Sequence, residues 1–172
     1  MGGLPALDSL LIHSCTHLTD ISALAGSPLS DLRIDHAPRL NSVGALNECS
    51  GLRKLMLGRC GSVQDFPSRG LTDLELDRVG WEDLSLLAHQ TPLRKLGITD
   101  DGTLKDAGAL AGMPALLELD LRHCPALTDG RFLLDMPSLR RAVLPGRLLT
   151  AASDGSADPV VAELRTRGVT VF

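Results

Sequence analysis

The chain has 172 residues, a formal net charge of −4 and a sequence pI of about 5.7. This acidic balance argues against a nucleic-acid-binding groove, so we expect no nucleic acid partner. No stretch approaches the ~18 apolar residues of a membrane-spanning helix, and no basic segment followed by an apolar one marks a secretory signal. We therefore expect no membrane association and a cytoplasmic location.

One pattern, L-x-x-L-x-L-x-x-C, recurs along the chain and is clearest at 116–124. The intervals between the first leucines of successive repeats are 22, 23, 19, 22, 23 and 23 residues. A fixed period in this range predicts a solenoid of stacked coils. The seven first leucines are Leu7, Leu29, Leu52, Leu71, Leu93, Leu116 and Leu139.

The centre of each repeat alternates apolar and polar residues, which predicts a short strand with its apolar side chains directed inward. One coil cannot bury its leucines alone, so successive strands should pair in parallel while neighbouring coils cover each other's leucines. The expected strands are Ser9–Ile12, Asp31–Ile34, Lys54–Leu57, Asp73–Leu76, Lys95–Ile98, Glu118–Leu121 and Arg141–Leu144.

The seven tandem matches between Leu4 and Leu149 resemble the leucine-rich repeat family. The resemblance implies an α/β right-handed solenoid with a parallel β-sheet on the concave side and short 3₁₀ or α segments on the convex side. Residues 18–24 resemble the bacterial 22-residue class found in internalins, whereas Cys124 with Leu127-Thr128-Asp129 resembles the cysteine-containing class.

That family usually places Asn where each strand ends and the chain turns. This chain has small, mostly apolar residues there, which predicts a tightly packed corner in place of an asparagine ladder. The residues at this position are Cys15, Ala37, Cys60, Val79, Asp101 and Cys124.

The first residues, Leu4-Pro5-Ala6-Leu7, match the ends of later repeats such as 113–116. We therefore expect the chain to begin in the last part of a coil, as a fragment of a longer protein. An uncapped first strand would present an apolar edge, and we expect any self-association to occur through it.

The interval of 19 residues in the third repeat predicts a shortened convex segment, with Phe66 filling the space. Trp81 follows in the next coil and has two interpretations. Its indole packs beside the shortened coil, or it is an exposed anchor for a partner.

The period is lost after Leu149, so we expect a solenoid of about seven coils at 1–149 and a terminal unit at 150–172. Residues 150–157 are small and polar, which predicts a loop. Asp158 followed by Pro159 predicts an N-cap and the first residue of a short helix. Residues 169–172 predict a last strand. We expect the helix and this strand together to form a C-terminal cap.

The four cysteines do not form a disulfide or metal pattern. Cys15, Cys60 and Cys124 occupy one repeat position in coils at least two apart, and Cys49 lies on the opposite side of its coil. No C-x-x-C or Cys/His spacing is present, so we expect free structural thiols, no metal and a reducing compartment.

The outward-facing residues of the expected strands carry most of the charge. Those just before the middle leucines alternate in sign from Asp31 to Arg141, which predicts a self-compensating ladder. Asp73, Glu75 and Asp77 put three carboxylates on one strand beside Met56, Gly58 and Gly97, either as a solvated face or as a binding site. The candidate binding residues on the concave face are Arg33, Asp35, Met56, Asp73, Glu75, Asp77, Asp120 and Arg122.

No nucleophile–base pair, phosphate-binding loop or metal-ligand spacing is present, so we expect no enzymatic activity and no cofactor. The hypothesis is a recognition module that binds a protein or peptide on its concave face. The composition resembles the C-terminal sensor arrays of bacterial NACHT-type, NLR-like STAND NTPases of bacterial immunity. The alternative is an internalin-like or effector-type module that binds a host protein. A Walker A motif upstream favours the sensor, and a signal peptide or cell-wall anchor favours the alternative.

Overall fold

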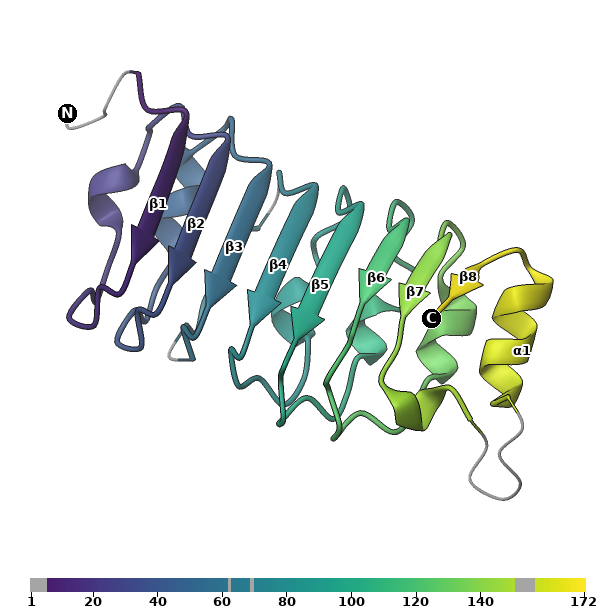
Figure 1. The fold of residues 1–172 in the computed structure, drawn as a ribbon. Coiled ribbons are helices and arrows are strands. Elements are labelled where there is room, and N and C mark those ends of the chain that lie inside the picture. Colours follow the sequence, from purple (N-terminus) through teal and green to yellow (C-terminus); the bar gives the residue numbers. More distant parts are fainter. Residues whose placement is uncertain (1–5, 62, 69, 151–156) are drawn as a thin grey trace.

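The computed structural model describes residues 6–61, 63–68, 70–150 and 157–172. Its strands form one parallel sheet in which spatial order follows chain order (Figure 1). The strands are β1 Ser9–His13, β2 Asp31–Asp35, β3 Lys54–Gly58, β4 Asp73–Asp77, β5 Lys95–Thr99, β6 Glu118–Asp120, β7 Arg141–Val143 and β8 Thr170–Val171.

Short helical turns lie on the opposite side of the solenoid from the sheet, and one α-helix lies beside the last strand (Figure 1). The expected three-residue spacing of apolar side chains therefore produces 3₁₀ turns, because i and i+3 eclipse in that geometry. The turns are η1 Ser22–Leu24, η2 Gly44–Glu48, η3 Ser85–Leu87, η4 Gly108–Leu110, η5 Arg131–Asp135 and η6 Gly146–Leu148, and the helix is α1 Pro159–Thr166.

The strand register confirms the prediction from the leucines. Each of the seven predicted strands begins at the residue expected, and all pair in parallel. The first five extend one residue further than predicted, and β6 and β7 end one residue earlier. The expected final strand is β8, which joins the same sheet through β7.

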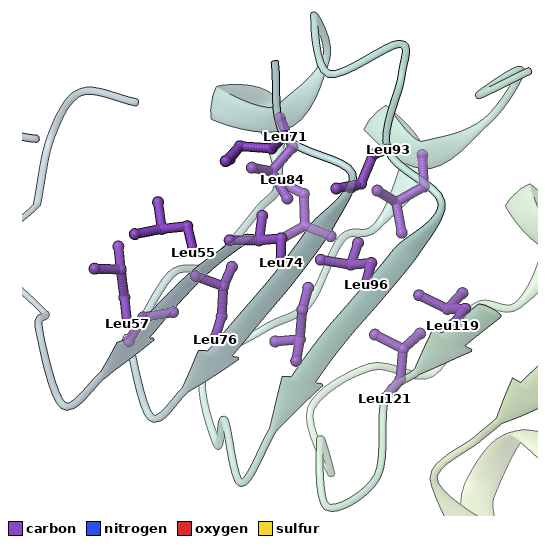
Figure 2. Close-up of a cluster of buried hydrophobic side chains, with 14 of the residues drawn as sticks. Leu55, Leu57, Leu71, Leu74, Leu76, Leu84, Leu93, Leu96, Leu119 and Leu121 are labelled. Carbon is purple, nitrogen blue, oxygen red and sulfur yellow. The ribbon is translucent and has the colours of Figure 1, made fainter. Parts of the chain in front are cut away.

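The buried leucines form continuous rows behind the sheet. Leu55, Leu74 and Leu96 occupy matching positions on successive strands and are each at most 2% exposed. Figure 2 shows these rows, with the inward side chains of neighbouring coils stacked against one another. Each coil supplies one layer of the core, so burial depends on the coils on either side.

The corner after each of the first six strands has a backbone conformation that the sequence did not reveal. Six residues that are not glycine have φ between 49° and 61°, in the left-handed region. This conformation is unfavourable for most L-residues, so surrounding contacts must hold it. In four of the corners the amide donates to a carbonyl of the next strand, as from Arg59 N to Asp77 O at 2.7 Å. The six residues are Ser14, His36, Arg59, Arg78, Asp100 and His123.

The predicted apolar corner is confirmed beyond the first coil. The Cys124 thiol is fully buried and donates to Ile98 O at 3.3 Å, in the preceding coil. Burial raises the pKa of Cys124 to about 11. Cys60 is also buried, with its Sγ 3.2 Å from Gly58 O, whereas Cys15 in the first coil is exposed.

Asp101 replaces the apolar corner residue in the fifth coil and is only 1% exposed. Its Oδ2 accepts from Gly80 N at 2.9 Å, and its Oδ1 accepts from the backbone N and the hydroxyl of Thr103 at 3.0 and 2.7 Å. Both carboxylate oxygens therefore satisfy donors at the turn, one of them in the preceding coil.

The third coil has the shortened convex segment that its 19-residue interval predicts, and no helical turn is described within it. Phe66 and Trp81 meet edge to face, with ring centroids 6.0 Å apart. Trp81 is half-buried against the core, which confirms the packing interpretation over the exposed anchor. Gln90, 1% exposed, donates through Nε2 to Pro67 O and so joins the third coil to the fourth.

The terminal helix begins as predicted, because Asp158 accepts from Val160 N at 2.8 Å and Pro159 is the first helical residue. Arg167 then donates to Leu134 O at 2.7 Å and fixes this end to η5. Thr150 and Ala157 form an isolated antiparallel bridge, and the rest of the expected loop lies outside the described residues. The expectation about the first five residues also falls outside them. Over the described ranges, no helix is long and apolar enough to cross a membrane.

Candidate binding groove on the sheet face

The solvent-facing side of the sheet, here called the sheet face, presents outward side chains in three rows. Pairing places Met56, Glu75, Gly97 and Asp120 in the middle row of β3 to β6. Neighbouring strands lie about 4.8 Å apart, so residues in one row are direct neighbours.

A shallow groove of about 770 Å³ runs over β3 to β7 on this face. It contains six of the eight candidate residues, Met56, Asp73, Glu75, Asp77, Asp120 and Arg122. The other outward-facing residues that line it are Lys95, Gly97, Thr99, Asp100, Glu118, His123, Arg141 and Val143. The sequence contained the signal for these: they continue the same rows into the neighbouring coils.

The groove is acidic. Six of its lining residues are Asp or Glu and three are Lys or Arg, which gives a formal charge of −3 with His123 neutral. Glu75 is exposed and has no ionic or hydrogen-bonding partner among the described residues. The carboxylate of Asp73 accepts from Thr72 Oγ1 at 2.6 Å, and that of Asp77 lies 3.7 Å from Arg78 Nε. The strand β4 therefore supplies most of the uncompensated negative charge.

Asp120 is fixed on the opposite side of the groove by Arg122. The guanidinium Nε lies 3.0 and 2.9 Å from the two carboxylate oxygens, and Nη2 makes a further bond. The backbone N of Arg122 also donates to Asp120 at 3.1 Å. Burial acts to raise the pKa of Asp120, but the hydrogen bonds from Arg122 lower it overall, so this group stays ionised.

The corner residues form a charged rim along one end of the groove. Asp100 lies between His123, whose Nδ1 is 2.9 Å away, and Arg78, whose Nη2 is 3.9 Å away. These three residues occupy the left-handed position of successive coils, so the corner geometry aligns them.

Two candidates, Arg33 and Asp35, lie outside the groove. Asp35 accepts from Arg59 Nε at 3.1 Å and lies 3.2 Å from His13 Nε2. The hydrogen bond from Arg59 lowers the pKa of Asp35. Its carboxylate also lies over Gly58, where a Cβ would come within 2.6 Å of Oδ1. The backbone of Gly58 is therefore not open to a ligand, because Asp35 occupies that space.

The predicted alternating ladder has the right register but few closed ion pairs. Within the described part of the chain, only Lys95 and Glu118 approach within 4 Å across strands of that row, at 3.2 Å. Asp31 pairs along its own strand with Arg33 at 3.4 Å. Arg141 lies over the Phe172 ring, 5.0 Å from its centroid. Local partners thus replace most of the cross-strand ones.

The described residues contain no group of three or more His, Cys, Asp or Glu side chains arranged to hold a metal ion.

A parallel strand in every coil, leucine rows behind the sheet and short 3₁₀ turns opposite define a leucine-rich repeat solenoid. Among solved structures, the chain is similar to one described as "Crystal structure of TLR13-ssRNA13 complex", with a TM-score of 0.61 and 22% sequence identity. The alignment covers 80% of this chain but 21% of that one, so the chain spans about a fifth of its neighbour's length. No protein-family model and no curated protein matches the sequence.

This comparison corrects one expectation. The similar solenoid is described in complex with single-stranded RNA, so a fold of this kind does not exclude nucleic acid, and the exclusion drawn from net charge is wrong. The net charge of −4 averages over the whole chain, so it cannot exclude a nucleic acid partner. Basic pairs occur locally where alternate strands begin, at Arg53-Lys54, Arg94-Lys95 and Arg140-Arg141.

Proposed function

We propose that the chain is a non-enzymatic recognition module whose groove binds a protein or peptide that carries basic side chains. The observation that supports this most strongly is the formal charge of −3 in a groove where Glu75 has no described partner. A ligand cation would give that carboxylate the partner it lacks. Complementary charge steers encounter and suppresses wrong partners more than it adds raw affinity.

The open form of the groove also favours an extended ligand over a small molecule. Small-molecule sites enclose most of their ligand in a concave, mainly apolar pocket. This groove is shallow, carries charged side chains along its length and is spread over five strands. A peptide lying across the strands can contact several rows at once.

We further propose that this recognition serves a sensor array of the kind found in bacterial NLR-like NTPases, with a cytoplasmic location. The support is the resemblance in composition and coil pattern described above, together with the leucine-rich repeat fold. A Walker A motif encoded upstream of Met1 is the expected finding. A signal peptide or cell-wall anchor there would instead favour the internalin-like alternative.

Fluorescence anisotropy tests the groove directly. The probes are a labelled ten-residue peptide of alternating Arg and Ser, its Glu–Ser counterpart, and a single-stranded RNA of 13 nucleotides. We expect the Arg–Ser peptide to bind and its Glu–Ser counterpart not to bind, and we expect binding to weaken as salt rises because exposed charges are screened. Binding of the RNA alone would replace the peptide proposal with a nucleic acid one.

Matched variants separate the groove from total charge. Glu75→Gln with Asp77→Asn removes two charges from the groove, and we expect it to weaken Arg–Ser binding about tenfold, or about 1.4 kcal/mol. Glu48→Gln with Asp135→Asn removes two exposed charges from η2 and η5 on the other side of the solenoid. We expect this control to bind as the wild type does. Equal loss in both variants would show a nonspecific charge effect and contradict the proposal.

A further inference from the structure

The middle row of the sheet face has one gap. Its members on β2, β3, β4, β6 and β7 all carry side chains, whereas β5 presents Gly97. Glu75 and Asp120 stand on the two strands that flank it. The result is a notch one strand wide, floored by backbone and walled by two carboxylates.

The fold does not require glycine at this position. Gly97 has no left-handed φ, and its pairing with β4 and β6 is regular. A Cβ built there would meet only Glu75 Cγ, at 3.8 Å, which is ordinary van der Waals contact. Glycine inside a strand weakens it, and where no bulge is present it often marks the close approach of a ligand.

Gly58 in the same sheet provides the contrast. There a Cβ would come within 2.6 Å of Asp35 Oδ1, so the protein's own side chain fills the space. The described residues place nothing comparable over Gly97. At Gly97, neither the backbone φ nor a described neighbouring side chain requires glycine. The close approach of a ligand is the remaining reason for a glycine in a regular strand.

We propose that the Gly97 notch is a specificity subsite for one arginine side chain of an extended peptide. This inference rests on the proposed function and refines it. The aliphatic stem would lie on the Gly97 backbone, where Glu75 Cγ is the only described side-chain atom within 4 Å of the Cβ position. The guanidinium would pair with Glu75, the wall that has no described partner, since its planar fork matches a carboxylate. The other wall, Asp120, is already held by Arg122 and sets the width of the notch.

The notch also has defined ends along β5. Lys95, paired with Glu118 at 3.2 Å, closes one end. Thr99, whose hydroxyl lies 3.4 Å from Asp77 Oδ1, closes the other. Only one outward position of the strand is therefore open, which fits a single side chain.

The test fills the notch and leaves every charge in place. Gly97→Val should fold at least as well as the wild type, because valine favours strands and the position has room. We expect its melting temperature to be equal or higher, while affinity for the Arg–Ser peptide falls about tenfold. Gly102→Val is the matched control, since Gly102 is exposed, lies outside the groove and has open space around its Cβ position.

The same peptide with citrulline in place of arginine separates charge from shape. We expect the wild type to lose affinity for it to about the level that Gly97→Val shows for the arginine peptide. Full arginine-peptide binding by Gly97→Val would overturn the notch and leave the groove proposal standing. Absence of arginine-peptide binding by the wild type would overturn both. Equal binding of the arginine and citrulline peptides would show that the notch does not recognise a cation.

Discussion

The leucine rows make a quantitative prediction at β6, where an inward and an outward residue stand side by side. Leu119 is 2% exposed and pairs with Leu96 and Ala142 in the same row. Leu119→Ala removes the equivalent of about three buried methylenes, which costs about 2.4 kcal/mol in transfer free energy. The cavity left between fixed coils adds to this, so we expect a loss of about 2.5–4.5 kcal/mol.

Asp120→Ala is the matched control on the adjacent residue. It removes the pair with Arg122, whose side chains are 25% and 51% exposed. A partly solvated pair of this kind is worth about 0–1 kcal/mol, so we expect a loss in that range. Urea denaturation followed by circular dichroism measures both variants. Equal losses at the two positions would refute the alternation of inward and outward side chains from which the groove is built.

Three further predictions concern the corners and the first coil. In the native protein, DTNB at pH 8 should modify the exposed Cys15 quickly and the buried thiols only after unfolding. The pKa of Cys124 is raised to about 11, against 9.0 for a free thiol. The free energy of unfolding should therefore fall between pH 9 and 11, where only the unfolded thiol ionises. Asp101→Asn should lower the free energy of unfolding by about 1–3 kcal/mol, although Asn is usual at this corner. The reason is that one carboxylate oxygen, which accepts from Gly80 or Thr103, is replaced by an NH2 group that faces another donor. An unchanged free energy of unfolding in urea titration would contradict the assigned hydrogen bonds. In hydrogen exchange, the β1 amides should exchange faster than those of β4. Among the described strands β1 pairs only with β2, and Leu11 is 66% exposed. Equal protection of β1 and β4 would contradict this one-sided packing.

The sheet could be predicted from the sequence because its register has only one solution. A slip of one residue would turn every leucine of a strand outward, so the burial of Leu74 and Leu76 alone fixes the outward faces of Asp73, Glu75 and Asp77. The same logic placed six of the eight candidate residues in one groove.

The corners could not be predicted, because their conformation is imposed from outside the local sequence. Ser14, Arg59 and Asp100 share no side-chain chemistry that favours a left-handed φ, yet all adopt it. In the folded chain, hydrogen bonds to the next coil hold that conformation, as from Ser14 N to Asp35 O at 2.9 Å.

The ion pairs could not be predicted from the repeat pattern either, because they depend on how far each side chain extends. Asp35 is paired with Arg59, 24 residues away, and not with a partner in its own row. Arg59 reaches back from the corner of the next coil, so Asp35 is withdrawn from the groove and covers Gly58 instead.

NMR of the backbone amides tests most directly whether the proposed groove over β3 to β7 is the binding surface. Glycine amides fall in a well-separated region of the spectrum and sample both sides of the solenoid. When the Arg–Ser peptide is added, the amide of Gly97 should shift progressively, while those of Gly108 and Gly112, in and beside η4 on the opposite side, should stay fixed. Shifts at Gly108 and Gly112 with an unmoved Gly97 would place the ligand on the other face and contradict the account.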